Sequence, residues 1–258
     1  MSITEYVGSS EQITIPEALW AIIFGMAKSR KTSTALSWPE PLFIAELDCS
    51  EERLKYCLDM HAAGKKATFD VITPSNQNML TESEAEDMMG RTEKMIRIAN
   101  SAGEGTLILD GGNTLYRLYQ LVFVGHDFSA GKPEDLKGAA SAGARADFAR
   151  ISQHFEQLLM PMRAHPNLNV VFTTEPKEVW VDGKGSGKFE PRGPDSWDFK
   201  FDVEMMTYVV GGEYDDSLGR AAPIEGYGVI KWCSYNDARM RGKIIKEPTF
   251  DKIRAMLA

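Results

Sequence analysis

Short apolar runs that read as buried strands alternate along this chain with segments that read as helices. Five such runs cover residues 18–24, 42–47, 67–72, 106–110 and 169–174. A strand that is apolar on both faces belongs inside a parallel sheet, because helices must cover both of its sides. The alternation therefore predicts an α/β domain with a mostly parallel sheet and helices on both faces.

The pattern changes towards the C-terminus and at two internal segments. Residues 205–210 and 227–233 read as strands of a C-terminal antiparallel β extension, followed by a short helix after Pro248. Residues 125–146 and 176–200 are rich in turn-forming residues and are predicted to be mobile loops. We expect an N-terminal arm over residues 1–17 and one domain over residues 18–258.

Composition excludes several classes of protein. No apolar run approaches the roughly 20 residues of a membrane span, so no membrane association is expected. The first 12 residues lack the features of a secretory signal, and three scattered cysteines favour a reduced, cytoplasmic setting. Four histidines form no zinc-ligand motif, and a net charge of −8 argues against a broad basic surface for duplex DNA.

The segment after the first strand is close to the phosphate-binding loop G-x-x-x-x-G-K-[ST]. Its residues are Gly25, Met26, Ala27, Lys28, Ser29, Arg30, Lys31 and Thr32, with Ser33 continuing into a helix. In such a loop the backbone N–H groups cradle phosphate, the lysine reaches the β- and γ-phosphates, and the following hydroxyl binds Mg²⁺. The alternative is a lysine-rich surface turn.

Arg30 occupies the position of the second glycine of the motif. A glycine there lets the backbone approach the phosphates closely. Three outcomes are open for an arginine: its side chain points away and leaves the loop intact, it contacts phosphate itself, or it weakens hydrolysis.

Acidic residues follow two of the predicted strands. Asp110 ends the strand 106–110, where it can support Mg²⁺, or it merely starts the turn Asp110-Gly111-Gly112-Asn113. Asp48 follows the second strand, where it is either a functional carboxylate or an N-terminal helix cap. Because ligands bind at the carboxyl ends of parallel strands, Lys31, Asp48, Asp110 and Thr174 are expected at one edge of the sheet.

These motifs resemble those of the RecA-like AAA-family ATPases of phages and archaeal viruses, which include single-strand annealing proteins. Their loop typically reads Gly-Pro-Pro-Lys-Ser-Gly-Lys-Thr, and this chain keeps its Lys28-Ser29 as well as Lys31-Thr32. The strand ending in Asp110 is similar to their Walker B strand. The similarity covers roughly residues 18–257.

The resemblance implies a RecA-like P-loop NTPase core, ATP and Mg²⁺ as cofactors, and ATP sites between subunits of a homo-oligomer. It implies that Lys31 binds phosphate, that Thr32 and Asp110 serve the metal, and that Asp48 or Glu46 activates the attacking water. We favour Asp48 because it lies beyond the strand end. Thr174 either senses the γ-phosphate or is an ordinary strand-end threonine.

Two further sets of residues follow from the resemblance and from composition. Cations near the C-terminus either reach a neighbour's γ-phosphate or form a solvated hairpin face: Lys231, Arg239 and Arg241. The segment 176–200 mixes cations with aromatic residues, as single-stranded DNA binders do, or is an ordinary flexible loop. Its candidate DNA-binding residues are Trp180, Lys184, Lys188 and Arg192.

The leading hypothesis is an ATPase that acts on single-stranded DNA in viral recombination, repair or replication. A single-strand-binding protein would be a further partner, and the host cytoplasm the location. Two alternatives stay open. One is a non-hydrolysing, nucleotide-dependent interaction module with a degenerate loop. The other is a nucleotide or small-molecule kinase.

Overall fold

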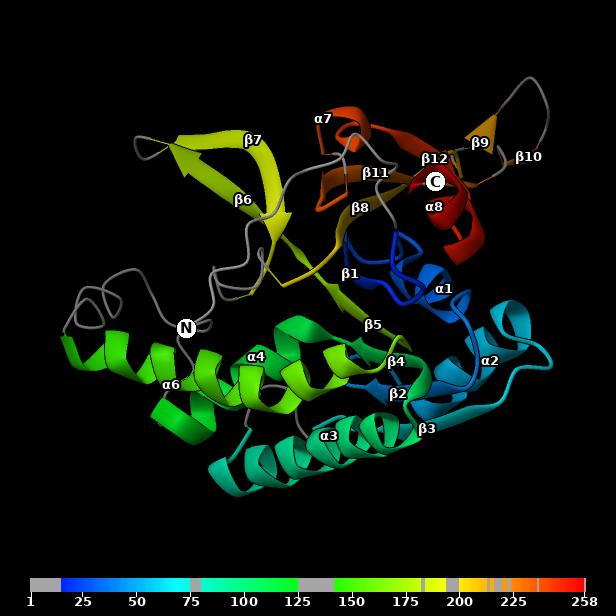
Figure 1. Ribbon diagram of the computed structural model, residues 1–258. Coiled ribbons are helices and arrows are strands. Elements are labelled where there is room, and N and C mark those ends of the chain that lie inside the picture. The colour runs from blue at the N-terminus through cyan, green and yellow to red at the C-terminus, as the bar shows by residue number, and fades with distance from the viewer. Residues whose placement is uncertain are drawn as a thin grey trace, which may run out of the picture.

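The protein is built around one eight-stranded sheet, seen in a computed structural model (Figure 1). The strands follow the order β12-β11-β8-β1-β5-β4-β2-β3. The structure describes residues 15–74, 80–124, 142–181, 184–193, 200–212, 214–215, 220–221, 224–235 and 237–257. Most of the predicted N-terminal arm and most of the segment 125–146 lie outside these ranges.

Six strands run parallel, as the alternation predicts. They are β1 (Trp20–Phe24), β2 (Leu42–Glu46), β3 (Ala67–Val71), β4 (Glu104–Asp110), β5 (Asn167–Thr174) and β8 (Val203–Val210). The predicted C-terminal extension is also present, because β11 (Glu225–Cys233) pairs antiparallel with both β8 and β12 (Ile244–Lys246). A short antiparallel pair, β9 (Tyr214–Asp215) and β10 (Arg220–Ala221), lies apart from this sheet.

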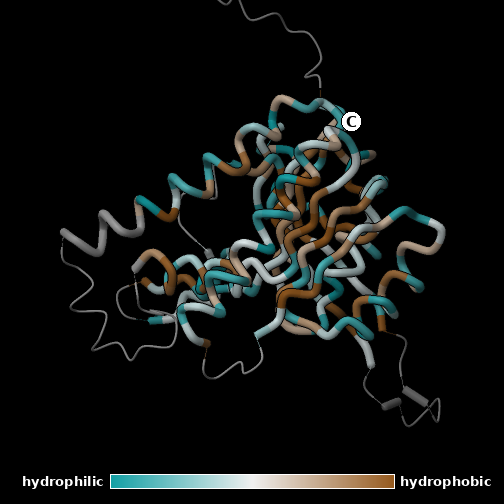
Figure 2. Tube along the Cα trace, turned by 90° about the horizontal axis from the view of Figure 1, so that it is seen from below, coloured by the Kyte–Doolittle hydropathy of each residue, from teal (hydrophilic) through white to brown (hydrophobic). Residues whose placement is uncertain are grey.

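Helices cover both faces of the sheet, and the strands alternate their side chains between two cores. In β1, Trp20 and Ile22 belong to one core, whereas Ala21 and Ile23 belong to the other. The first core lies under α3 (Glu82–Ala102), α4 (Gly112–Val124), α6 (Ala142–Leu159) and the 3₁₀ turn η1 (Met160–Ala164). The second lies under α1 (Lys31–Leu36), α2 (Glu51–His61), α7 (Asp237–Met240) and α8 (Phe250–Leu257). Figure 2 shows the hydrophobic strands at the centre of the molecule.

Local signals in the sequence set the helix ends. Ser50 caps α2 by accepting the Arg53 N–H, as predicted. Thr81 and Glu84 form a reciprocal capping box at the start of α3, and Gly103 ends that helix in a left-handed conformation. These caps fix where the helices meet the sheet edges, and therefore which residues lie beyond each strand.

The prediction of a loop over 176–200 is wrong for most of that segment. The strands β6 (Pro176–Val181) and β7 (Lys184–Pro191) pair antiparallel as a hairpin, which projects beyond the main sheet (Figure 1). The glycines that suggested a loop allow close approach instead. A Cβ on Gly185 would lie 2.5 Å from a Glu178 carboxylate oxygen, and the Gly187 N–H donates to the same carboxylate.

Two helical segments also differ from expectation. Helix α4 was not predicted, since the turn-like Asp110-Gly111-Gly112-Asn113 hides its start; its Leu115, Leu118 and Tyr119 are fully buried. Helix α6 already begins at Ala142, inside the segment 125–146 that was expected to be a loop. Among the described residues, no helix is both long and apolar enough to cross a membrane.

Candidate functional site

The loop between β1 and α1 begins at a glycine that cannot carry a side chain. A Cβ on Gly25 would lie 2.3 Å from the Thr207 carbonyl oxygen and 2.5 Å from the Ser29 hydroxyl oxygen. Ser29 is buried, and its hydroxyl pairs with that of Thr207 at 3.0 Å. The inner part of the loop is therefore anchored on β8, the strand next to β1.

Two non-glycine residues of the loop adopt left-handed backbone conformations, Lys28 with φ 64° and Arg30 with φ 70°. Arg30 thus takes the kind of conformation for which a glycine would be favoured. Its guanidinium contacts Glu247 and the Ile224 carbonyl oxygen, which belong to the C-terminal part of the chain. The Arg30 side chain is therefore directed towards the C-terminal part of the chain, whereas its effect on hydrolysis stays a prediction.

Lys31 crosses the concave side of the loop. Its Nζ donates to the carbonyl oxygens of Gly25, at 2.8 Å, and Met26, at 3.1 Å. Burial lowers the pKa of Lys31, while the negative charges of Asp110, Asp48 and Glu175 act in the opposite direction. The ammonium group is therefore enclosed by the loop and faces three carboxylates.

Asp110 meets the loop at the end of β4, as the sequence predicts. Its carboxylate accepts a hydrogen bond from the Thr32 hydroxyl at 2.6 Å and another from the Thr173 hydroxyl. Asp110 is only 5% exposed. Thr174 does not reach this cluster, since its hydroxyl donates to the Arg192 carbonyl oxygen. Thr173, one position earlier on β5, is the threonine in contact with the site.

Glu46, at the end of β2, is almost fully buried beside Asp110. Its Oε1 accepts the N–H groups of Asp48, at 2.8 Å, and Cys49, at 2.9 Å. Its Oε2 is buried without a hydrogen-bond partner among the described residues. Burial, and after it the charge of Asp110, raise the pKa of Glu46 to about 8. At neutral pH this carboxyl group therefore holds a proton.

Replacing Glu46 by glutamine should stabilise the protein at alkaline pH. Because the folded pKa of about 8 exceeds the ordinary value of 4.5, the Glu46 contribution to stability is complete below pH 4.5 and lost as pH rises through 8. Glutamine never ionises, so Glu46→Gln should unfold roughly 5 °C above the parent at pH 8. This shift corresponds to a free energy of unfolding higher by on the order of 2 kcal/mol.

Calorimetric melting between pH 5 and 8, without Mg²⁺ or nucleotide, measures this difference. The exposed Glu86 on α3 supplies the control, and Glu86→Gln should track the parent at every pH. A melting difference between Glu46→Gln and the parent that does not change with pH would contradict the buried-proton interpretation.

Asp48 lies beyond the end of β2 and opens onto the cleft. It accepts the Thr114 hydroxyl at 2.5 Å, and Gly111 leaves room for it, since a Cβ there would lie 2.8 Å from the carboxylate carbon. The Asp48 side chain is exposed on the side of the cleft. The surrounding protein nevertheless desolvates its carboxyl group and raises its pKa to about 6, while the hydrogen bond from Thr114 acts to lower the pKa. Asp48 is therefore ionised at neutral pH.

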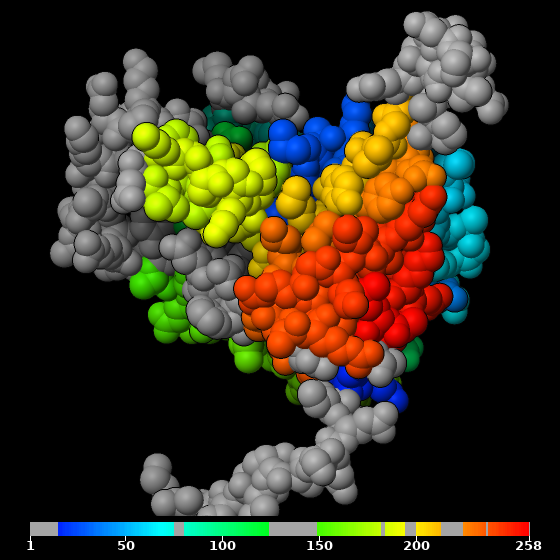
Figure 3. Space-filling model, turned by 90° about the horizontal axis from the view of Figure 1, so that it is seen from above, coloured from blue at the N-terminus to red at the C-terminus, as the bar shows by residue number. Residues whose placement is uncertain are grey.

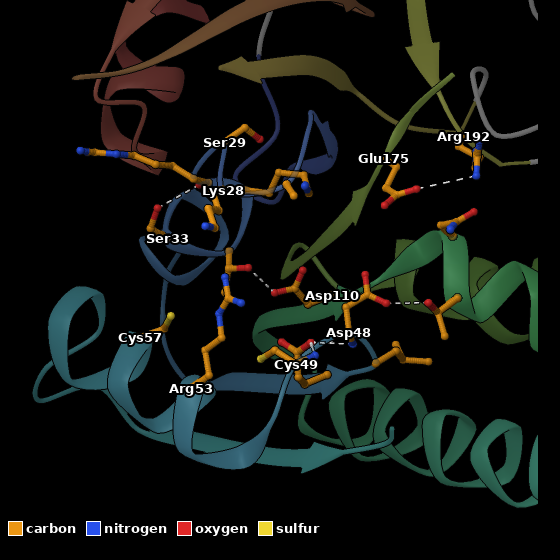
Figure 4. A pocket seen from close by; sticks show the side chains of 18 of the residues that line it. Lys28, Ser29, Ser33, Asp48, Cys49, Arg53, Cys57, Asp110, Glu175 and Arg192 are labelled. Atoms are coloured by element: carbon orange, nitrogen blue, oxygen red, sulfur yellow. Dashed lines mark hydrogen bonds and ion pairs between the residues drawn. The ribbon is translucent and has the colours of Figure 1, made fainter. Parts of the chain in front are cut away.

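These groups line one open cleft of about 700 Å³, a volume within the usual range for small-molecule sites. Arginines from three elements also line it: Arg53 of α2, Arg117 of α4 and Arg192 at the base of the hairpin. Figure 4 shows Arg53 extending from α2 towards the loop, and Arg192 paired with Glu175 at 3.7 Å. Neither Arg53 nor Arg117 was predicted to line the cleft. Arg53 could have been found from the sequence, because it lies in the first turn of α2, shortly after Asp48.

The remaining predicted residues lie elsewhere. Trp180, Lys184 and Lys188 are exposed on the hairpin, outside the cleft. The three C-terminal cations also lie outside the described lining of the cleft. Lys231 belongs to β11, Arg239 to α7, and Arg241 to the turn after α7. Arg241 pairs with Asp237 at 2.7 Å.

The donor set of the cleft fits a hard cation that shares its coordination with phosphate. Thr32 and Asp110 are already in contact, and the unpartnered Oε2 of Glu46 lies buried beside Asp110. No group of three or more His, Cys, Asp or Glu side chains suited to a metal occurs in the described part of the chain. Mg²⁺ in phosphate-binding sites needs only one or two carboxylates, with phosphate and water as its other ligands.

No protein-family model matches this chain, and no curated protein matches it either.

Proposed function

We propose that this protein binds ATP with Mg²⁺ in the cleft and hydrolyses it, as a RecA-like ATPase. The observation that carries the proposal is the position of Lys31, bonded across the concave side of the loop and facing Asp110 and Asp48. A cation in a loop of this kind, opposite carboxylates at the ends of neighbouring strands, suits a phosphate chain bound together with a divalent metal.

In this proposal each residue has a separate task. Lys31 and the loop N–H groups bind the phosphates, and Thr32 and Asp110, which are already in contact, would hold Mg²⁺. The metal, when bound, neutralises charge on the transferred phosphoryl group. Arg53, from α2, supplies a further positive charge at the cleft.

Asp48 is better suited than Glu46 to accept a proton from the attacking water. It is ionised at neutral pH, open to the cleft, and oriented by Thr114. Glu46 is buried, already accepts two backbone N–H groups, and holds a proton. A general base must carry its charge before the reaction begins, which favours Asp48.

The proposed partner of the ATPase is single-stranded DNA, bound by the β6–β7 hairpin. The hairpin carries Trp180, which is 67% exposed, together with the exposed Lys184 and Lys188. Figure 3 shows it in yellow-green on the surface, beside the C-terminal strands in orange and red. Its base residues Glu175 and Arg192 line the cleft, so the hairpin connects the proposed DNA contacts with the nucleotide site.

Phosphate release, measured with and without single-stranded DNA, tests the proposed activity. We expect Mg²⁺-dependent release that rises when DNA is added. ATP binding without release under any DNA condition would favour a nucleotide-dependent interaction module, and transfer to an added nucleoside monophosphate would favour a kinase.

A subunit-bridging role for Lys231, Arg239 or Arg241 would appear as lost turnover in their alanine variants with ATP binding retained.

Removing the exposed aromatic of the hairpin should weaken DNA binding selectively. Stacking on one base contributes about 1–3 kcal/mol, so Trp180→Ala should weaken oligonucleotide binding by roughly 5- to 150-fold. ATP binding without DNA should not change. Tyr56 on α2, which is 64% exposed, gives the control Tyr56→Ala. Fluorescence anisotropy of a labelled oligonucleotide measures both; equal affinities in the two variants would exclude Trp180 as a DNA contact.

A further inference from the structure

Arg30 is fixed at its far end by the C-terminal part of the chain. One guanidinium nitrogen contacts the Glu247 carboxylate, and the other donates to the Ile224 carbonyl oxygen at 2.9 Å. The second oxygen of Glu247 accepts the Gly226 N–H at 2.7 Å. The Glu247 carboxylate therefore bridges Arg30 of the loop, 217 residues earlier in the sequence, and Gly226 near the start of strand β11.

The path of Arg30 depends on a glycine in β11. A Cβ on Gly226 would lie 2.7 Å from Cδ of Arg30 and 3.2 Å from its Nε. The aliphatic part of Arg30 thus runs directly over the backbone of this strand. Any other residue at position 226 would displace the arginine.

Glu247 is itself held in an unusual conformation. Its φ is 47°, and its backbone N–H donates to the Gly226 carbonyl oxygen at 2.7 Å. Lys252 of α8 donates to the carbonyl oxygens of Glu247, at 2.9 Å, and Lys246, at 2.8 Å. The carboxylate that receives Arg30 is therefore positioned by β11 and α8 together.

We propose that Glu247 is a positioning residue for the phosphate loop. A non-glycine residue reaches the left-handed region only at an energetic cost, which glycine avoids. The contacts of Arg30 with Glu247 and Ile224 offset this cost and hold position 30 in the conformation that a glycine adopts freely. The bridge to Glu247 thus takes the place of the missing glycine.

This arrangement couples the loop to the C-terminal strands. In so far as it concerns ATP, the inference rests on the proposed function. If the conformation of Arg30 sets ATP affinity, then changes at Glu247 alter ATP binding although Glu247 does not line the cleft in the described structure. By linkage, ATP must stabilise the bridge to the same degree.

A double-mutant cycle tests the inference. Glu247→Gln keeps the size of the side chain and removes its charge, whereas Arg30→Gly removes the need for the bridge. We expect Glu247→Gln to bind ATP about tenfold more weakly than the parent, and the affinity of Arg30→Gly alone serves as the reference for the second background. In the double variant, Glu247→Gln should add no further loss. Glu225→Gln, which breaks the Lys246 ion pair in the same strands, is the matched control and should bind as the parent does.

Amide hydrogen exchange over residues 26–33, measured without nucleotide, gives a second readout that does not depend on ATP. Exchange should accelerate in Glu247→Gln and not in Glu225→Gln. The inference is overturned if Glu247→Gln changes neither ATP affinity nor amide exchange. It is also overturned if Glu247→Gln weakens ATP binding tenfold in the Arg30→Gly background as well. If the parent fails to bind ATP, the proposed function fails and exchange alone decides on the bridge.

Arg30→Ala covers the case in which Glu247→Gln does not fold. Alanine keeps the Cβ and loses the bridge, so Arg30→Ala should bind ATP about tenfold more weakly than Arg30→Gly. Equal affinity of these two variants would also overturn the inference.

Discussion

Replacement of Lys31 by alanine should lower ATP turnover by at least about 100-fold and also weaken ATP binding. Lys31 bonds across the loop and has Asp110, Asp48 and Glu175 near enough to influence its pKa. No other described lysine bonds to the loop carbonyl oxygens in this way. Its loss removes the ammonium group that bonds to the carbonyl oxygens of Gly25 and Met26.

Lys28 provides the comparison for Lys31, because both are lysines of the same loop. Lys28 is exposed and already has a left-handed backbone, so an alanine there keeps the backbone requirement unchanged. We expect Lys28→Ala to reduce turnover by no more than about fivefold, as removal of an exposed charge does. Initial-rate phosphate release and equilibrium ATP binding would be measured for both. Similar losses in the two variants would contradict a special role for Lys31.

Replacement of Asp48 by asparagine should lower turnover by about 10²–10³-fold while ATP binding stays within a few-fold of the parent. Asparagine keeps an oxygen for the Thr114 hydroxyl but cannot accept the proton of water. Because the pKa of Asp48 is raised to about 6, turnover of the parent should fall as pH drops below 6. Asp48→Asn should lose this dependence.

Glu46→Gln separates the two candidate bases. Glu46 already holds a proton at neutral pH, so its glutamine variant should keep more turnover than Asp48→Asn. The pH profile of turnover between pH 5 and 8 would be measured for both variants. Full turnover in Asp48→Asn together with an inactive Glu46→Gln would assign the base to Glu46 instead.

The sequence predicts the strand-end part of the site because the strands are parallel and buried. Asp110 ends an apolar run, Asp48 follows one directly, and Lys31 follows one after the phosphate loop. Parallel strands bring such positions to one edge of the sheet. The caps Ser50 and Thr81 are equally local signals. For these residues, short segments of sequence contain enough information to place a side chain.

Features that depend on distant contacts were not predictable in the same way. The direction of Arg30 is set by Glu247, Ile224 and Gly226, which lie about two hundred residues further along the chain. Helix α4 follows two glycines that read as a turn, although burial of its Leu115 and Leu118 outweighs that local preference. Likewise, the backbone pairing of β6 and β7 outweighs the loop-like composition of the hairpin.

The central claim is that the cleft between the loop, Asp48 and Asp110 is a site for ATP with Mg²⁺. Calorimetric titration of the full chain with ATP tests it most directly, with and without Mg²⁺. We expect saturable binding of one ATP per chain that weakens strongly without Mg²⁺ and is lost in Lys31→Ala. Absence of saturable binding at millimolar ATP, or equal binding by the parent and Lys31→Ala, would contradict it.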